Sequence, residues 1–241
     1  MPANRFYTPR PLVPFSSLSL SGPEFHHLCH VMRIQLEEQV ELVNGLGELG
    51  YARVVSIKEK HAELFIDHCL KMLPSEHSIT LAQALPHFKK LEWIIEKGTE
   101  LGVAEFFLFP GEESEKKSLS TSQIDRLKIL MITALKQSGN LFLPQLSLHP
   151  SIFGWDPSVW VDRFSFYGAP FSKKFLSYSV APLFRTTLFN GPEKGFTSKE
   201  IKHLHLLHAH PVQWHHHILR CETAAIVGIA QLYLSYKTQK N

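Results

Sequence analysis

Thr187-Leu-Phe-Asn-Gly-Pro-Glu-Lys-Gly-Phe-Thr-Ser-Lys-Glu200 has the pattern of a strand, a tight turn and the start of a helix. It begins as a short apolar strand, and Gly191 and Gly195 let the backbone turn sharply and approach a ligand closely. Thr197 and Glu200 have the spacing of a capping box, which begins a helix. A plain strand-turn-helix connection explains the stretch as well, so the turn alone is weak evidence for a binding site.

A second stretch, Ile218-Leu-Arg-Cys-Glu-Thr-Ala224, leads into the last apolar part of the chain. It offers a cation at Arg220, a carboxylate at Glu222 and a hydroxyl at Thr223. Backbone N–H groups at a helix start attract anions, such as a phosphate or the carboxylate of a cofactor. The alternative is that Glu222 or Thr223 only caps the helix and that Arg220 pairs with an acid. The two stretches together are stronger evidence for a binding site than either one alone.

Strands alternate with helices on both sides of these stretches. The expected strands are Ile79–Leu85, Glu105–Phe109, Phe164–Tyr167, Thr187–Asn190 and His205–His208. The expected helices are Phe88–Leu101 followed by Gly102 at its end, Ser122–Leu135 with Ser122 as its cap, and Glu222–Tyr236. This alternation predicts an α/β fold with a mostly parallel sheet.

The first seventy residues have a different pattern. Short β-prone runs at Gln39–Val43, Tyr51–Ile57 and Ala62–Ile66 are separated by turn residues, which is the spacing of a small β-barrel. A short helix is expected from Pro23 to Met32. Pro74-Ser-Glu76 is expected to be a linker.

Composition places only broad limits on function. The chain has 241 residues, 44% of them hydrophobic, and a formal net charge of +3, which permits nucleic-acid binding without requiring it. Cys29, Cys69 and Cys221 are far apart and form no CxxC pair, which argues against a disulfide framework or a thiolate zinc site. No apolar run is long enough to span a membrane, so we expect a cytoplasmic protein.

Several ordered motifs resemble one family, the bacterial 16S ribosomal RNA uridine-N3 methyltransferases of the SPOUT superfamily. The matching motifs are Asn4–Phe6, His26–Leu28, Val31–Arg33, Val43–Gly45, Lys90–Val103, Ala134–Gly139, Gly191–Phe196 and Ile218–Ala224. The resemblance covers nearly the whole chain.

The resemblance implies a PUA-like β-barrel over residues 1–72 that helps to hold RNA. It implies a SPOUT domain over residues 73–241 whose cofactor loops form a trefoil knot, a threaded topology that is rare among folds. It also implies a homodimer packed through the knot region. The implied reaction transfers a methyl group from S-adenosylmethionine to N3 of a uridine in the decoding region of 16S ribosomal RNA, within the assembled small subunit.

The resemblance also implies site residues. The expected cofactor-binding residues are Tyr167, Gly168, Asn190, Gly191, Pro192, Gly195, Trp214, Ile218, Leu219 and Thr223. The expected RNA-binding residues are Asn4, Arg5, His26, Arg33, Lys90, Lys97 and Gln137. For Lys90 and Lys97, a solvated helix face is an equally good explanation.

Methylation of uridine N3 requires an in-line methyl donor, loss of the N3 proton and stabilisation of charge on the uracil carbonyl oxygens. Arg220 is the candidate catalytic residue for this stabilisation, although it also suits a phosphate. The sequence names no histidine or carboxylate as general base, since uracil N3–H is acidic enough for a positioned water to accept its proton.

Three places depart from the family's usual pattern. The family turn usually reads Gly-Pro-Glu-Gly-Gly, and the fourth place here is Lys194, which is strained by about 1 kcal/mol or more if its φ is positive. The usual Leu-Gly-x-Arg is replaced by Trp214-His-His-His217, so His215 is expected to narrow the adenine site. His217 is expected to supply an arginine's charge only at acidic pH. Asn140 stands where an arginine is common.

These departures leave two interpretations open. One is an active methyltransferase, and the other is a noncatalytic RNA-binding or ribosome-assembly protein in which Lys194 and His215 spoil the cofactor pocket. The seven histidines from His203 to His217 do not predict a metal site, because no carboxylate or thiolate completes a ligand spacing.

Overall fold

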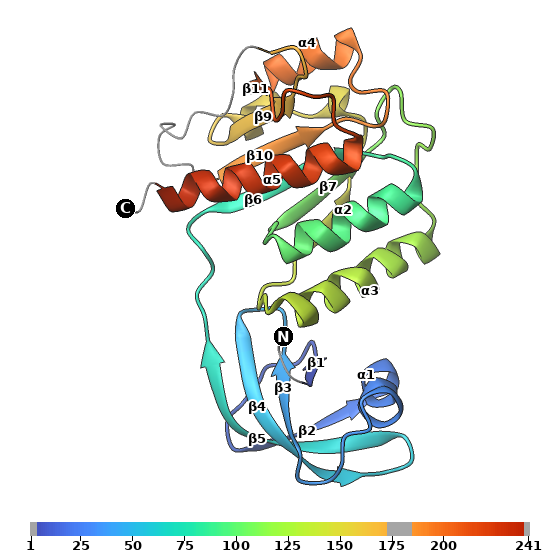
Figure 1. Ribbon diagram of the computed structural model, residues 1–241, viewed down its shortest axis with the longest axis vertical. Helices are drawn as coiled ribbons and strands as arrows, with labels where there is room; N and C mark the ends of the chain where they lie inside the picture. Colours follow the sequence, from blue (N-terminus) through green and yellow to red (C-terminus); the bar gives the residue numbers. More distant parts are fainter. Residues whose placement is uncertain (1–3, 173–184, 239–241) are drawn as a thin grey trace. The chain divides into compact units, whose positions relative to one another are not determined.

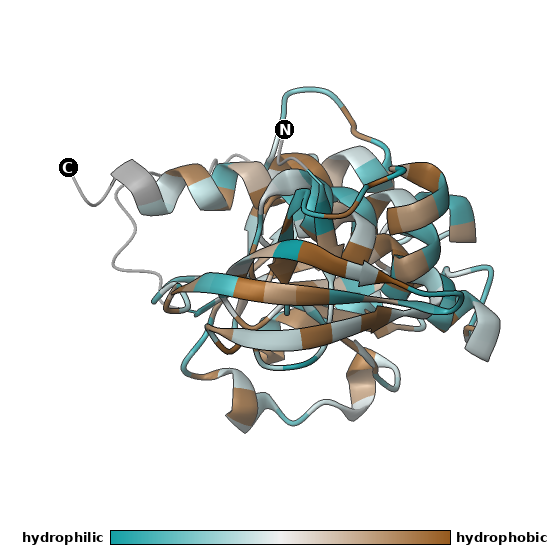
Figure 2. Cartoon of the chain, turned by 90° about the horizontal axis from the view of Figure 1, so that it is seen from below, coloured by the Kyte–Doolittle hydropathy of each residue, from teal (hydrophilic) through white to brown (hydrophobic). Residues whose placement is uncertain are grey.

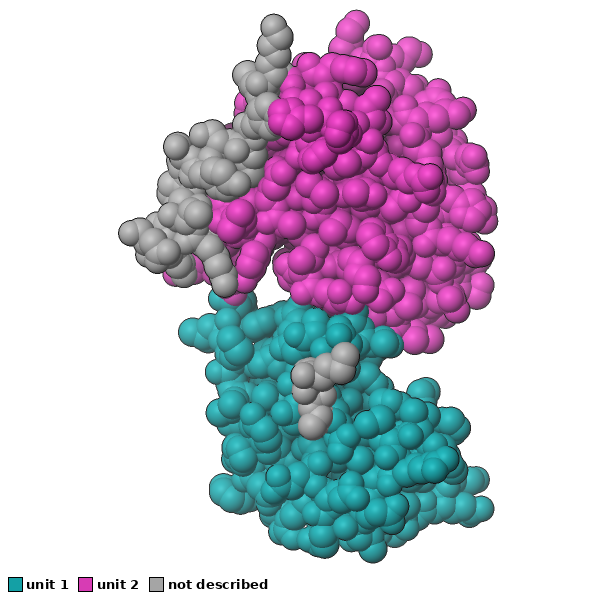
Figure 3. Space-filling model, in the orientation of Figure 1, with its two compact units in different colours: residues 1–74, 132–143 teal, residues 75–131, 144–241 magenta. Residues whose placement is uncertain are grey.

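The computed structural model describes residues 4–172 and 185–238, which form two compact units (Figures 1 and 3). The first unit contains the chain up to Pro74 together with Ile132–Leu143. The second contains Ser75–Met131 and the chain from Pro144 onward. Helix α3, Thr121–Ser138, therefore contributes to both units, which nothing in the sequence indicated. The domain limits 1–72 and 73–241 stay a prediction.

The first unit is built on a curled five-stranded sheet with the strand order β1-β3-β4-β5-β2. Its strands are β1 Arg5–Tyr7, β2 Ser16–Ser21, β3 Gln39–Val43, β4 Glu48–Ile57 and β5 His61–Lys71. Strand β1 runs parallel to β3, and the other pairs are antiparallel. The predicted helix is present as α1, Gly22–His26, followed by a π-helical turn at His27–Val31.

Alternating side chains fill the core of the first unit. Buried and less buried residues alternate along much of β4 and β5, and Phe6, Leu42 and Leu64 are fully buried in the core. Figure 2 shows hydrophobic and hydrophilic residues interspersed along the strands that face the viewer. The end of α3 is held by an ion pair in which Lys136 Nζ lies 2.7 Å from Glu24 Oε1, with both side chains mostly buried.

The second unit is a six-stranded sheet in the order β11-β9-β10-β6-β7-β8, and every described strand pair in it is parallel. Its strands are β6 Ser78–Ala84, β7 Glu105–Phe109, β8 Gln145–Leu148, β9 Phe164–Gly168, β10 Arg185–Asn190 and β11 Ala209–Val212. Its helices are α2 Phe88–Glu100, α4 Ser198–Leu206 and α5 Cys221–Thr238, with short 3-10 turns at Ile152–Gly154 and Pro157–Trp160. The predicted mostly parallel α/β sheet is confirmed.

The two faces of this sheet are covered by different helices (Figure 1). Helices α2 and α5 pack together on the face that carries Phe106 and Leu188. On the opposite face, α4 and the first 3-10 turn pack on a core that includes Tyr167 and Phe189. Neighbouring residues of a strand point to opposite faces of the sheet, so Leu188 packs under α2 and α5 while Phe189 packs under α4.

Two local predictions are wrong. His205–His208 is not a strand, because α4 extends to Leu206 and the strand follows at Ala209. The alternation of histidine and leucine resembled a strand, but the Thr197 capping box begins a helix that buries Leu204. The cap of α3 is Ser120 rather than Ser122, since Ser120 Oγ accepts from the backbone N–H of Gln123 at 3.3 Å. Gly102 does end α2 with φ of +81°.

Close packing of α2 on the sheet gives a stability prediction. In Gly98→Ala, the added Cβ would lie 2.8 Å from the ring of Phe106, so we expect the free energy of unfolding to fall by about 1–3 kcal/mol. Gly154→Ala is the control, because its Cβ would meet nothing closer than 3.9 Å. All four tryptophans lie in the second unit, so their fluorescence during urea unfolding measures this change. Equal unfolding midpoints for the two variants would contradict it.

Candidate functional site

A cavity of about 200 Å³ lies at the carboxyl ends of β9 and β10. Three segments surround it: Gly168–Pro170 after β9, the turn Asn190–Phe196 after β10, and the stretch from Trp214 to Leu219 that leads into α5. Cys221 and Ala224 from the first turn of α5 complete its lining. Ligands of parallel α/β sheets bind at this end of the strands, so the cavity is the candidate site.

Three glycines allow the chain to turn and pack closely around the cavity. A Cβ added to Gly191 would lie 3.1 Å from the backbone of Gly195, and one added to Gly168 would lie 2.9 Å from Nε1 of Trp214. Gly195 has φ of +76°, and its N–H donates to the carbonyl of Pro192 at 2.9 Å. Glycine is therefore required at 168 and 191 by close approach and at 195 by conformation.

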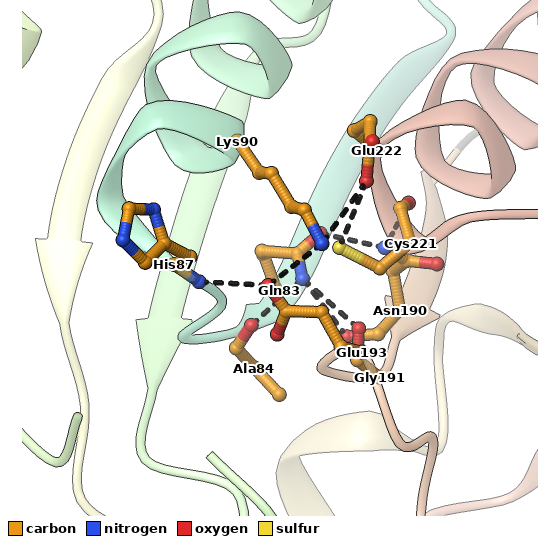
Figure 4. A network of polar contacts seen from close by, with 9 residues as sticks. All are labelled: Gln83, Ala84, His87, Lys90, Asn190, Gly191, Glu193, Cys221 and Glu222. Atoms are coloured by element: carbon orange, nitrogen blue, oxygen red, sulfur yellow. Dashed lines mark hydrogen bonds and ion pairs between the residues drawn. The ribbon is translucent and has the colours of Figure 1, made fainter. Parts of the chain in front are cut away.

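A buried pair of amides connects the segments around the cavity (Figure 4). Asn190 Nδ2 donates to Oε1 of Gln83 at 2.8 Å and to the carbonyl of Cys221 at 2.9 Å. Gln83 Nε2 donates to the carbonyls of Ala84 and Gly191 at 2.7 and 3.2 Å. These contacts join the end of β6, the turn and the start of α5.

Charged groups connect the same segments nearer the surface (Figure 4). Glu193 Oε1 accepts from the backbone N–H of His87 at 3.0 Å and lies 3.1 Å from Lys90 Nζ. Lys90 Nζ also lies 3.9 Å from Glu222 Oε2. Burial alone raises the pKa of Glu193, but the hydrogen bonds from His87 and Lys90 hold that pKa below its ordinary value. Burial, with the nearby carboxylates, raises the pKa of the Cys221 thiol to about 12.

Most of the expected cofactor residues surround this cavity. Those that line it are Gly168, Asn190, Gly191, Pro192, Gly195, Trp214, Ile218 and Leu219. Tyr167 does not line it, because its side chain points to the α4 face and its hydroxyl lies 3.0 Å from Nε2 of His205. Thr223 is half-buried on α5 outside the lining. Arg220 is exposed beside the cavity, and its carbonyl accepts the N–H of Ala224 at 2.8 Å.

The expected RNA-binding residues of the first unit differ in how accessible they are. Arg5 pairs with Glu41 at 2.6 Å, and its side chain is only 8% exposed. His26 is exposed beside His30, with ring centroids 4.9 Å apart, and Arg33 is exposed with φ of +55°. The remaining two are half-buried Asn4 and exposed Gln137.

In the second unit, both expected RNA-binding lysines have acidic partners. Lys97 Nζ lies 2.9 Å from Glu96 and 2.8 Å from Glu100. Lys90 is held by Glu193, so in this structure it supports the turn after β10.

Sequence reasoning missed Gln83 and the role of Glu193. Gln83 lies in an otherwise apolar strand, which is the signal that could have indicated a buried polar partner. Sequence reasoning also overstated the backbone strain at Lys194, whose φ is not positive. The Lys194 side chain is 72% exposed and lies 3.4 Å from Glu113.

A metal cluster and a membrane-spanning helix are both absent from the part of the chain that the structure describes. No three His, Cys, Asp or Glu side chains within it are arranged to hold a metal ion. No helix within residues 4–172 and 185–238 combines the length and apolar character needed to cross a membrane.

The pairing of Glu193 predicts a pH-dependent stability. We expect Glu193→Gln to lower the free energy of unfolding near pH 7 by about 0.5–1 kcal/mol, since the ion pair with Lys90 is replaced by a neutral contact. The pKa of Glu193 in the fold lies below its ordinary 4.5, so the carboxylate stabilises the fold above that pH. This stabilisation is lost as the pH falls through the folded-state pKa. The free energies of unfolding of the wild type and of Glu193→Gln should therefore become equal there.

The control for this measurement is Glu113→Gln, which removes the more exposed partner of Lys194. We expect it to change stability less than Glu193→Gln does. Urea unfolding at a series of pH values tests both, and a difference for Glu193→Gln that persists in acid would contradict the assignment.

Comparison with known proteins relates this arrangement to one family. A family model described as RNA methyltransferase domain matches residues 73–233, and one described as RNA methyltransferase PUA domain matches residues 20–67. "Ribosomal RNA small subunit methyltransferase E" of Buchnera aphidicola is 25% identical over 88% of this chain and 86% of its own. The protein of the same name from Bacillus subtilis is 26% identical over 92% and 91%.

Solved structures share the fold. The Neisseria gonorrhoeae ribosomal RNA small subunit methyltransferase E, bound to S-adenosyl methionine, has a TM-score of 0.86 at 23% identity and covers 96% of this chain and 97% of its own. A putative methyltransferase from Legionella pneumophila, also in complex with this cofactor, has a TM-score of 0.85 at 25% identity with the same coverage. The expected α/β methyltransferase domain with a mostly parallel sheet, preceded by a PUA-like domain, is confirmed. With the methyltransferase model matching most of its length, this chain belongs to the RNA methyltransferase family.

Proposed function

We propose that this protein transfers a methyl group from S-adenosylmethionine to N3 of a uridine in the decoding region of 16S ribosomal RNA. The observation that carries the proposal is the cavity between the turn Asn190–Phe196 and the stretch Trp214–Leu219. The names of the relatives, and the cofactor bound in two structural neighbours, support it. The assembled small subunit in the cytoplasm is the proposed setting.

The walls of the cavity fit a nucleoside. Gly168 and Gly191 let the chain pack closely against Trp214 and Gly195 beside the cavity, and the position next to Gly195 is open, so a flat adenosine can lie against this turn. Backbone groups of Ile218 and Leu219 would hold its other side. When bound, S-adenosylmethionine supplies an electrophilic methyl group on a sulfonium.

The chain's own groups would then orient the uridine and balance its charge. The exposed guanidinium of Arg220 stands beside the cavity and, among the described residues, has no ion-pair partner. Placed against a uracil carbonyl oxygen, it would stabilise the negative charge that appears when N3 loses its proton. A water accepts that proton in this proposal, because no carboxylate or imidazole is assigned as a base.

The first unit supplies the proposed RNA-side residues. Arg33, His26 and Gln137 are exposed there, whereas the Arg5 charge is already paired with Glu41. We retain all seven expected RNA-binding residues as proposals, and we expect Arg33 to contribute more binding energy than Arg5, since no buried ion pair must be broken.

The noncatalytic alternative loses its main support. Lys194 projects outward without a positive φ, so it does not strain the turn. His215 is exposed at the edge of the cavity, and the cavity remains open beside it.

Helix α5 supports a homodimer packed through the knot region. Between Glu222 and Lys237 this helix has no charged residue. One side is buried against α2, β6 and β10, yet Ala230 is exposed. A helix that is apolar on all sides is normally covered on all sides. A second copy of this chain is the proposed cover.

The function is tested by calorimetry and by methyl transfer. We expect the protein to bind S-adenosylmethionine and to methylate reconstituted small subunits at a uridine N3. Free 16S RNA is the comparison substrate, and mass spectrometry of digested RNA identifies the methylated base. A complete lack of cofactor binding at millimolar concentration would overturn the enzyme interpretation.

Arg220→Ala separates catalysis from cofactor binding. We expect methyl transfer to fall by about 100-fold or more while cofactor affinity is retained, because the guanidinium acts on the uracil and not on the cavity wall. Arg185→Ala, at the opposite end of β10, is the matched control with normal activity. Undiminished turnover in Arg220→Ala would refute the assigned role.

Ala230→Glu tests the dimer. Ala230 is exposed on α5, so a monomer tolerates the glutamate, whereas a dimer would have to bury its charge. We expect sedimentation equilibrium to show a dimer for the wild type and a folded monomer for Ala230→Glu. Lys202→Glu on α4 should remain dimeric. A dimer that persists in Ala230→Glu would exclude this face.

A further inference from the structure

Glu222 is a mostly buried carboxylate whose charge the fold balances only in part. Its side chain is 16% exposed, and the cation beside it is Lys90, whose Nζ lies 3.9 Å away (Figure 4). That lysine lies closer to Glu193, at 3.1 Å, so one ammonium serves two carboxylates. In the part of the chain that the structure describes, the Glu222 side chain accepts one weak hydrogen bond, from the Cys221 thiol at 3.6 Å. Burying a carboxylate is costly unless a cation or strong donors balance it.

The two carboxylates are balanced to different extents. Glu193 also accepts a hydrogen bond from the backbone N–H of His87 at 3.0 Å, and its pKa lies below the ordinary value. Glu222 lies in the first turn of α5, where the helix N-terminus offsets about half an elementary charge. After Lys90 and the helix are counted, the pair of carboxylates still retains about half a negative charge.

This negative charge acts inside the cavity. Glu193 and Cys221 both line it. Burial is the main cause that raises the pKa of the Cys221 thiol to about 12, and Glu193 and Glu222 each raise that pKa more than Lys90 lowers it.

Other charged groups near the cavity oppose the carboxylates only weakly. Lys194 is paired with Glu113 at 3.4 Å, and its side chain is 72% exposed. Arg220 is exposed beside the cavity, and His215 and His217 are exposed at its edge, so solvent and salt screen any charge they carry. A ligand inside the cavity therefore meets a negative potential from the side of Glu222.

The positive charge of S-adenosylmethionine is on its sulfur, and loss of the methyl group leaves the neutral thioether S-adenosylhomocysteine. The proposed reaction requires this sulfur to lie close to Arg220, because N3 of uracil is bonded to the carbons of both carbonyl groups that the guanidinium could contact. Arg220 directly precedes Cys221 and Glu222 in the chain. The negative charge is therefore expected near the reacting sulfur rather than near the adenine.

We infer that Glu222 is a specificity-determining residue that favours the positively charged methyl donor over its neutral product by supplying negative charge near the sulfonium. The inference rests on the proposed function for the identity of the cofactor. Once the methyl group has moved to the RNA, the sulfur is neutral and Glu222 no longer attracts it. The product then leaves more readily, and a fresh cofactor takes its place.

The test compares two ligands that differ only in the methyl group and its charge. Calorimetry without RNA gives the Kd of S-adenosylhomocysteine and of S-adenosylmethionine, and the quantity of interest is the first divided by the second. We expect Glu222→Gln to lower this ratio about threefold to tenfold, as for one charge removed several ångströms away in a partly solvated site. A variant that only distorts the cavity weakens both ligands and leaves the ratio unchanged.

Lys90→Met makes the opposite change in charge. It removes the ammonium that offsets Glu193 and Glu222, so the ratio should rise above the wild-type value even if both affinities fall. This variant decides the question alone if Glu222→Gln does not fold. Tryptophan fluorescence during urea unfolding checks that each variant is folded.

Glu100→Gln is the matched control. At the other end of α2, Lys97 is likewise held by two carboxylates, Glu96 at 2.9 Å and Glu100 at 2.8 Å. The control therefore removes an equivalent charge about 15 Å along the helix from Lys90. It should keep the wild-type ratio.

The inference is overturned if Glu222→Gln weakens both ligands equally, if Lys90→Met shifts the ratio in the same direction as Glu222→Gln, or if the control lowers the ratio as much. A wild type that binds neither ligand would refute the proposed function and this inference with it. A wild type that shows the expected ratios yet transfers no methyl group would refute the proposed function alone.

Discussion

The geometry of the cofactor cavity depends on the amide pair of Gln83 and Asn190. Both side chains are almost completely buried, so each amide must find partners inside the protein. The partners come from the end of β6, the turn after β10 and the first residue of α5, which are distant in sequence. Removing either amide would leave the other partly unsatisfied, at a cost of about 1–3 kcal/mol, and would free the turn from the helix.

The same three segments are joined a second time by charge. Lys90 lies between Glu193 of the turn and Glu222 of α5, and the backbone of His87 holds Glu193 from the other side. The buried amides fix the spacing of the segments, and the half-buried ion pairs fix the orientation of the turn. The cavity is thus preorganised by this chain's own contacts before any ligand arrives.

The sequence was informative where local chemistry determines structure. Glycines at 191 and 195 and the capping box of Thr197 predicted a turn and a helix, and both are present. Sequence reasoning failed where two interacting residues lie far apart in the chain. The pairing of Lys90 with Glu193 joins residues far apart in the chain, so Lys90 looked like a surface lysine. The packing of Ile132–Leu143 in the first unit has no local signal either, because α3 continues without a break between the units.

Close packing around the cavity decides which substitutions it can accept. Gly168 and Gly191 lie so near Trp214 and Gly195 that an added Cβ would meet protein atoms at 2.9–3.1 Å. Lys194, by contrast, has an exposed side chain and no positive φ, so a different side chain there need not change the backbone of the turn. The cavity is therefore intolerant of change at these glycines and tolerant of it at its exposed side chains.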